Sequence, residues 1–128
     1  MTSQPIGLGP IGQIAIAVND LDAAVAFYRD KLGMAFLFSA PGLAFFDCGG
    51  VRLMLSRPET PELDHPSSII YFKVDDIHAA HAALAERGVP FDEAPHMIAN
   101  MGTYDLWMAF FRDQDRNLLA IMGEIAHS

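Results

Sequence analysis

The chain has 128 residues, of which 52% are hydrophobic, enough for a single domain with a substantial core. A formal net charge of −8 without any run of Lys or Arg disfavours binding to nucleic acid or to an anionic membrane. No apolar stretch approaches the roughly 20 residues that cross a bilayer, and residues 1–9 lack the pattern of a secretion signal. Cys48 is the only cysteine, which excludes an internal disulfide. We therefore expect one cytoplasmic domain over 1–128.

The first half of the chain predicts a strand, a helix and three further strands. Residues 12–18 are rich in Ile and Val and stop at Asn19 and Asp20, either of which can cap a helix. The apolar residues of that helix follow helical spacing, and Gly33 suits its end. Together these elements make a first module over 11–57. Its later strands are predicted at 34–39, 43–48 and 51–56.

The second half repeats this order after a proline-rich linker over 58–67. Its module, over 68–124, starts with a strand at 68–74. A helix capped by Asp75 or Asp76 follows and ends at Gly88. The remaining strands are predicted at 91–98, 105–112 and 117–122.

Two segments of the first module return in the second, which indicates an internal duplication. Val18-Asn19-Asp20-Leu21-Asp22-Ala23-Ala24 returns as Val74-Asp75-Asp76-Ile77-His78-Ala79-Ala80, and Leu43-Ala44-Phe45-Phe46 returns as Met108-Ala109-Phe110-Phe111. A duplicated unit that cannot bury its own face packs on its twin, and the seam between the two is a natural pocket. We predict an α+β fold of two tandem βαβββ modules that form a curved, partly open mixed sheet around a cleft.

Side chains of a strand alternate between two faces, and the two faces of these strands differ in composition. One set is wholly apolar and should pack beneath the helices. It consists of Ile14, Ile16, Val18, Val51, Leu53, Leu55, Ile70, Phe72, Val74, Leu119 and Ile121. The opposite set mixes small, polar and flexible residues, which favours a concave binding wall over a merely solvated face. It consists of Gln13, Ala15, Ala17, Arg52, Met54, Ser56, Ile69, Tyr71, Lys73, Leu118, Ala120 and Met122.

Four segments, at 14–21, 26–34, 71–76 and 111–118, carry a family resemblance. Among them are Ala26-Phe27-Tyr28-Arg29-Asp30-Lys31-Leu32-Gly33-Met34 and Phe111-Arg112-Asp113-Gln114-Asp115-Arg116-Asn117-Leu118. The chain resembles the vicinal oxygen chelate superfamily, which includes glyoxalases, bleomycin-resistance proteins and ring-cleaving dioxygenases. Gln114 and Arg116 replace the Pro and Gly of the usual Asp-Pro-Asp-Gly turn. The resemblance implies the predicted fold and a homodimer.

In metal-dependent members of that superfamily, His, Glu or Gln side chains from the first and last strands of both modules hold a divalent ion. The corresponding positions here are Gln13, Met54, Ile69 and Ala120. An amide oxygen is a weak ligand, a thioether suits soft ions only, and the other two side chains have no donor atom. We therefore expect no metal site for Fe, Zn, Ni or Mn and no cofactor.

The predicted wall contains Arg52 and Lys73 but no acid, in a strongly acidic chain. This favours a small anionic ligand with an aromatic body, paired with Arg52 and oriented by Tyr71 and Gln13. His96 and Trp107 are further candidates for the pocket. The full set of predicted ligand-binding residues is Gln13, Arg52, Met54, Ile69, Tyr71, His96, Trp107, Ala120 and Met122.

No catalytic residue can be identified, so the sequence leaves open whether the protein is an enzyme. Binding or sequestration of a small molecule is the leading hypothesis. A metal-dependent lyase, isomerase or dioxygenase is one alternative, and a metal-free acid–base enzyme using Tyr71, His96 or Glu93 is another. Cys48 has no identifiable partner histidine and is interpreted as a small packing residue. His127 is expected in a fraying tail.

Overall fold

The computed structural model describes residues 11–58, 61 and 68–127. Most of the predicted linker over 58–67 therefore lies outside the described residues. Two βαβββ modules follow one another, as predicted. The first contains β1 (Gln13–Ala17), α1 (Leu21–Ala26), a π-helix η1 (Phe27–Lys31), β2 (Ala35–Ala40), β3 (Leu43–Cys48) and β4 (Val51–Ser56). The second contains β5 (Ile70–Lys73), α2 (Ile77–Glu86), β6 (His96–Asn100), β7 (Tyr104–Arg112) and β8 (Leu118–Ala126).

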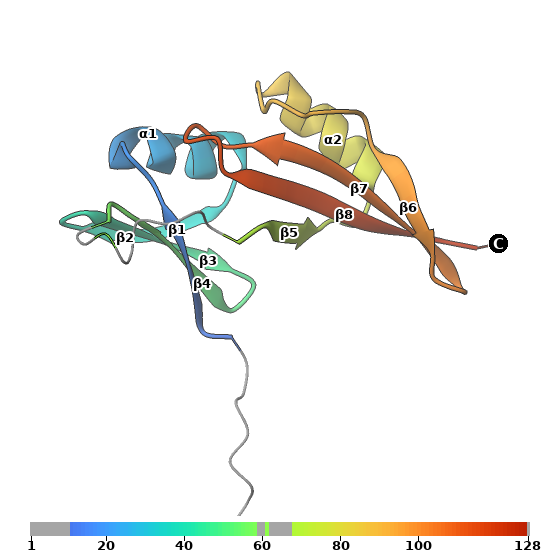
Figure 1. Cartoon of the computed structure of the whole chain (residues 1–128), viewed down its shortest axis with the longest axis horizontal. Coiled ribbons are helices and arrows are strands. Elements are labelled where there is room, and N and C mark those ends of the chain that lie inside the picture. Colours follow the sequence, from blue (N-terminus) through green and yellow to red (C-terminus); the bar gives the residue numbers. More distant parts are fainter. Residues whose placement is uncertain (1–10, 59–60, 62–67, 128) are drawn as a thin grey trace, which may run out of the picture.

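Each module has its own four-stranded mixed sheet, ordered β1-β4-β3-β2 in the first and β5-β8-β7-β6 in the second. The first and last strands of a module pair in parallel, and its other pairs are antiparallel. Both helices lie on the same side of the two sheets (Figure 1). We call the opposite, uncovered side the open face. Among the described residues, no helix is long and apolar enough to span a membrane.

The two helices start in the same way because the duplicated segments place an aspartate at the same position. The side chain of Asp20 accepts a hydrogen bond from the backbone N–H of Ala23 at 3.1 Å. Asp76 does the same for the N–H of Ala79, also at 3.1 Å. Of the two capping residues proposed for each helix, the second is therefore the one that satisfies a free N–H of the first turn.

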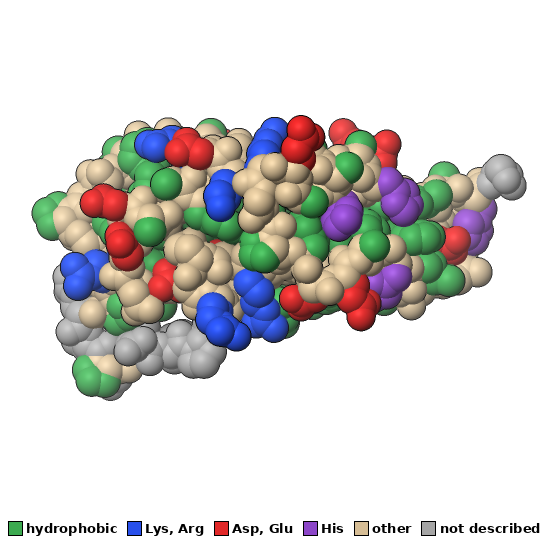
Figure 2. Space-filling view, turned by 90° about the horizontal axis from the view of Figure 1, so that it is seen from above, with side chains coloured by type: hydrophobic (Ala, Val, Ile, Leu, Met, Phe, Trp, Pro, Cys, Tyr) green, Lys and Arg blue, Asp and Glu red, His purple; other side chains and the backbone are tan. Residues whose placement is uncertain are grey.

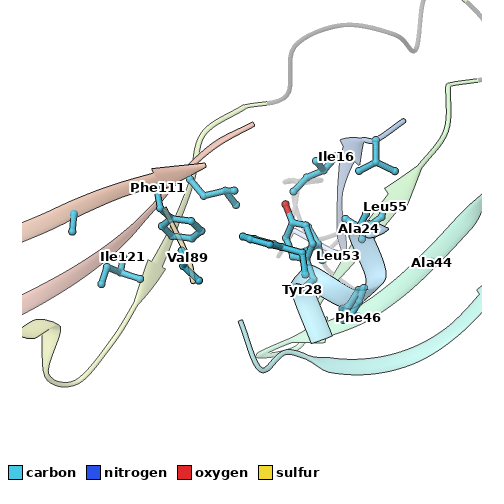
Figure 3. Packing of buried hydrophobic residues seen from close by; sticks show 14 of the residues in the cluster. Ile16, Ala24, Tyr28, Ala44, Phe46, Leu53, Leu55, Val89, Phe111 and Ile121 are labelled. Atoms are coloured by element: carbon cyan, nitrogen blue, oxygen red, sulfur yellow. The ribbon is translucent and has the colours of Figure 1, made fainter. Parts of the chain in front are cut away.

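A single hydrophobic core joins the two modules. Figure 3 shows Phe111 and Val89 of the second module on the side that faces Tyr28 of the first, with Ile121 behind them; all four belong to one cluster of buried residues. Nearly all of the predicted core residues belong to this cluster or pack against it; half-buried Val51, at the Gly49-Gly50 turn, is the exception. Burial of this shared apolar surface holds the two sheets in one arrangement.

A buried polar network accompanies this core at the junction of the modules. The Tyr28 hydroxyl donates a hydrogen bond to Asp113 Oδ2 at 2.8 Å. Asp113 is only 4% exposed and also accepts from the backbone N–H of Asp115 at 2.9 Å and of Asn117 at 2.8 Å. The Asn117 amide donates to Asp113 Oδ2 at 2.9 Å and to the carbonyl of Ala17 in β1 at 3.2 Å. We call Tyr28, Asp113 and Asn117 the junction network.

The sequence did not predict the winding of η1, which directs Tyr28 into this network. The helix was expected to continue regularly to Gly33, but it changes to a π-helix at Phe27. The N–H of Leu32 donates to the carbonyl of Phe27 at 3.0 Å, one residue farther than in an α-helix. Gly33 then ends the segment with φ of +71°, a conformation that suits glycine.

Two strand boundaries differ from the prediction. The strand expected at 91–98 is wrong in position, because β6 starts at His96 and Phe91 makes only an isolated bridge to Phe111. Prolines 90 and 95 have no N–H to donate, so this segment cannot form a continuous ladder. In contrast, β8 continues past Met122 to Ala126.

Gly123 lies inside β8 because α2 packs directly on it. A Cβ atom at Gly123 would come within 2.9 Å of Ile77 Cβ, so only glycine permits this approach. The longer strand also fixes His127, which was wrongly expected to fray. Its backbone N–H donates to the carbonyl of Thr103 at 2.9 Å, and its Nε2 lies 2.8 Å from Asp105 Oδ1.

Candidate functional site

The open face of the first module carries a cluster of one cation and two aromatic rings. Arg52 in β4 is paired with Gln13 in β1, and its Nε donates to Gln13 Oε1 at 2.8 Å. The guanidinium lies 5.0 Å from the centre of the Phe45 ring, which is 4.7 Å from the ring of Phe38. We call Gln13, Arg52, Phe45 and Phe38 the Arg52 cluster. It combines hydrogen-bond donors with apolar rings on one wall.

The open face of the second module carries an aromatic pair at the equivalent place. Ala120 in β8 has Tyr71 in β5 and Phe110 in β7 as its neighbours across the strands. The two rings meet edge to face, with centroids 5.9 Å apart. Ala120 is 0% exposed because these larger side chains close over it. The small residue thus serves as the base of an aromatic surface.

The open face also contains an acid that the sequence reading missed. Glu124 follows Met122 on the same face of β8, and its carboxylate lies 3.5 Å from Lys73 Nζ. The statement that this face has cations but no acid is therefore wrong. It failed because β8 was expected to stop before Gly123. Since Lys73 already has a partner, Arg52 is the better candidate to meet an anion.

A pocket of about 350 Å³ opens beside the aromatic pair of the second module. It is lined by Asp92, Glu93, His96, Phe110 and Leu118. His96 Nδ1 lies 4.0 Å from Glu93 Oε2 and 3.4 Å from the carbonyl of Ala94. This pocket places His96, a predicted site residue, next to Phe110, which was not predicted.

The predicted site residues lie on both sheets, and one of these residues, Trp107, is not on the open face. Trp107 points to the helix-covered side, where it packs against the core and meets the ring of His78 edge to face at 5.2 Å. His78 is exposed, while His81 is half-buried against Phe91. On the open face the first module contributes Gln13, Arg52 and Met54, and the second contributes Tyr71, His96, Ala120 and Met122. Ile69 is exposed and lies just before β5, outside the paired strand.

Phe45 and Phe110 are the main residues that the sequence reading missed, although the internal repeat contained the signal. Leu43-Ala44-Phe45-Phe46 and Met108-Ala109-Phe110-Phe111 align these two phenylalanines. In both copies the neighbouring Ala and the second Phe are buried in the core. The first Phe must then point to the open face, because side chains of a strand alternate.

The four positions that bind metal in some relatives of this fold do not make a fitting site here. Gln13 Oε1 accepts the hydrogen bond from Arg52, and Gln13 Nε2 faces the sulfur of Met54 at 3.6 Å. Ile69 has no donor atom, and Ala120 is covered by the aromatic pair. Within the described part of the chain, no group of three or more His, Cys, Asp or Glu side chains is placed so that it could hold a metal ion. This donor set does not suit a divalent ion.

Cys48 does not form a nucleophilic site. It ends β3 and is half-buried, and burial together with the neighbouring Asp47 carboxylate raises the pKa of its thiol. A raised pKa keeps the sulfur in the less reactive thiol form.

The helix-covered side has a different character from the open face. Acidic and basic side chains are interspersed over this surface, and histidines gather over the second module (Figure 2). The helix-covered side also places rings beside polar groups, as at His78 and Trp107. The open face differs because it carries the exposed rings of Phe38 and Tyr71 as well as the Arg52 guanidinium and the pocket of the second module. This contrast makes the open face the candidate binding surface.

Paired βαβββ modules with helices on one side and an open sheet face on the other define the glyoxalase-like class of folds. Residues 10–121 match the model of the Glyoxalase/Bleomycin resistance protein/Dioxygenase superfamily, and the chain belongs to this superfamily. The resemblance inferred from the sequence is thereby confirmed.

Individual relatives agree with this assignment. The uncharacterized protein YraH of Bacillus subtilis (strain 168) is 31% identical over 123 residues, covering 85% of this chain and 94% of YraH. A lactoylglutathione lyase from Agrobacterium tumefaciens is 25% identical, with a TM-score of 0.74 over 91% of this chain and 94% of the lyase. TnmS3, an antibiotic binding protein from Streptomyces sp. CB03234, is 24% identical, with a TM-score of 0.75 over 94% and 99% of the two chains.

Proposed function

We propose that this protein binds a small aromatic acid on the open face and needs no metal ion to do so. The proposal depends on which residues occupy the four positions that bind metal in metal-dependent members of the family, and on the contacts that these residues make. Gln13 is engaged by Arg52, Ala120 is covered by aromatic rings, and Met54 and Ile69 lack suitable donors. A relative with this fold, TnmS3, is an antibiotic binding protein, which supports a binding role for such a scaffold.

The Arg52 cluster supplies the chemistry for an anionic aromatic ligand. A guanidinium has five N–H donors, and among the described residues only Gln13 accepts one of them. The others are available to a carboxylate, which Arg can bind through two parallel hydrogen bonds, or to a phenolate. Phe38 is 50% exposed and offers apolar surface for the body of the ligand, while the buried ring of Phe45 supports both Phe38 and the Arg52 guanidinium. Met54, in register with Phe45, adds a flexible side chain.

We also propose that the protein is a cytoplasmic homodimer in which a second copy closes the open face. Tyr71 on this face is 43% exposed and Ile69, just before β5, is 42% exposed, although burial of both apolar side chains would be favourable. Sedimentation equilibrium is expected to give a mass of twice the 14.0 kDa of the chain. A mass of one chain across the micromolar range would contradict this part of the proposal.

An acid–base enzyme is the second candidate because His96 and Glu93 share a pocket. Their closest approach of 4.0 Å exceeds a hydrogen bond, and the side chain of Glu93 is 77% exposed. A catalytic pair needs a held geometry, which these side chains lack. Binding without turnover therefore remains the function that the site supports best.

The proposed function is tested with a ligand pair that differs only in charge. Calorimetric titration is expected to show that 3-phenylpropanoate binds about tenfold more tightly than 3-phenylpropanamide, since only the acid forms a charge-assisted pair with Arg52. Arg52→Ala should remove this preference and leave the weaker amide binding in place. Arg29→Ala is the matched control, because this exposed arginine pairs with Asp30 on η1.

Two results would contradict the proposal. Equal binding of the acid and the amide would show that Arg52 does not select an anion. Stoichiometric iron, nickel or zinc in protein purified from metal-supplemented cultures would show that the family positions bind metal after all. That second result would favour the alternative of a metal-dependent lyase, isomerase or dioxygenase.

A further inference from the structure

The pocket of the second module differs in charge from the Arg52 cluster. Its two carboxylates belong to Asp92 and Glu93, in the segment that leads into β6. The N–H of Asp92 donates to the carbonyl of Phe110 at 2.9 Å, and the N–H of Arg112 donates to the carbonyl of Pro90 at 3.2 Å. These backbone bonds hold the segment along β7. The carboxylates are thereby placed at the rim of the pocket.

The base of this pocket is apolar. Phe110 and Leu118 lie on the open face of β7 and β8, and both are half-buried. Tyr71 supports the Phe110 ring from the other side of Ala120 by the edge-to-face contact at 5.9 Å. A ligand that enters a pocket of about 350 Å³ therefore meets an aromatic ring below and carboxylates at the rim.

Among the residues that the structure describes, no Lys or Arg side chain forms an ion pair with Asp92 or Glu93. None of the residues that line the pocket is Lys or Arg. The imidazole of His96 is 4.0 Å from Glu93, and the guanidinium of Arg112, two residues after Phe110 on β7, donates to the carbonyl of Arg116 at 3.4 Å. Lys73, on the same module, is paired with Glu124 instead. In a chain with a net charge of −8, a cation is the ligand charge that this rim favours.

We propose that this pocket binds a protonated amine carried on an apolar body, so that Asp92 and Glu93 pair with the ammonium group and Phe110 and Leu118 contact the body. An ammonium group is stabilised by hydrogen bonds to carboxylate oxygens and by electrostatic attraction to the face of an aromatic ring. The inference rests on the proposed function, because the pocket is part of the open face. It extends that function by naming a second charge, opposite to the one at Arg52, that the site recognises.

The test compares 3-phenylpropylamine with 3-phenylpropanol, which have the same body and differ in charge. Calorimetric titration of the full chain is expected to give about fivefold tighter binding of the amine, a modest factor because the rim is exposed to water. The double variant Asp92→Asn, Glu93→Gln should bind the amine no better than the alcohol. The control variant Asp22→Asn, Glu86→Gln changes the net charge equally at exposed helix positions and should keep the preference.

Each other outcome overturns the inference in a recognisable way. Equal affinity of the wild-type protein for the amine and the alcohol would contradict the inference. An equal loss in the control variant assigns the preference to the net charge of the chain rather than to the pocket. If 3-phenylpropanoate binds through Arg52 while the amine shows no preference, the inference fails and the proposed function stands. If none of the phenylpropyl probes binds at millimolar concentration, both fail together.

Discussion

Replacing Asp113 with alanine is expected to lower the free energy of unfolding by about 3–5 kcal/mol. The carboxylate is buried and accepts hydrogen bonds from the Tyr28 hydroxyl, the Asn117 amide and two backbone N–H groups. Alanine leaves these donors without an acceptor where water has little access. Each unsatisfied buried donor costs about 1–3 kcal/mol, so the loss exceeds that of an ordinary surface substitution. Urea denaturation followed by circular dichroism measures it.

Two further variants separate the network from its surroundings. Asp113→Asn keeps one oxygen acceptor, so its free energy of unfolding should fall by only about 1–2 kcal/mol. This variant allows a measurement even if the alanine variant does not fold. Asp115→Ala alters the same turn but removes only exposed acceptors, those for the N–H of Asn19 and for the side-chain amide of Gln114, so its loss should stay below about 1 kcal/mol. A wild-type midpoint for Asp113→Ala would contradict the role assigned to the junction network.

The consequence of this network for function is geometric. Tyr28 belongs to the first module, while Asp113 and Asn117 belong to the turn between β7 and β8 of the second. The two open faces lie on separate sheets, so their relative placement depends on contacts at the junction. A network of directed hydrogen bonds fixes that placement more specifically than apolar packing alone. Loosening the junction should therefore disturb the open face without touching any residue on it.

Much of the fold could be predicted because the sequence repeats its own pattern. The alternation of Ile14, Ile16 and Val18 against Gln13, Ala15 and Ala17 predicts which side of β1 is buried, and the burial of Ile16 and Val18 confirms it. The capping aspartates and the strands at 43–48 and 51–56 also follow from local signals. These features depend on neighbours in the chain, which a sequence displays directly.

The candidate site was less predictable because it depends on contacts between distant segments. Nothing near Gly123 in the sequence shows that Ile77 will pack on it and extend β8, so Glu124 was missed as the partner of Lys73. The sequence near Phe27 likewise gives no sign of the π-helical turn that brings Tyr28 to Asp113. Propensity describes local preference, and here tertiary packing decided the outcome.

The stability of the protein is expected to fall with increasing pH above about pH 10 because of Tyr28. Burial, reinforced by the nearby Asp113 carboxylate, raises the pKa of the Tyr28 hydroxyl far above its ordinary value. In the unfolded chain this phenol releases its proton near pH 10, whereas in the folded chain it keeps it. The folded state then binds more protons than the unfolded state, so each further pH unit removes about 1.4 kcal/mol from the free energy of unfolding.

Comparison with Tyr28→Phe isolates this effect from the other groups that titrate in base. At about pH 8 the variant should be less stable by about 2 kcal/mol, since it lacks the hydrogen bond to a charged acceptor. Between about pH 8 and pH 11 the difference should shrink by about 1.4 kcal/mol, because only the wild type has a phenol that must ionise on unfolding. Urea titrations at these pH values measure the difference. A constant difference throughout would mean that the hydroxyl ionises equally in both states, and that Asp113 does not hold its proton.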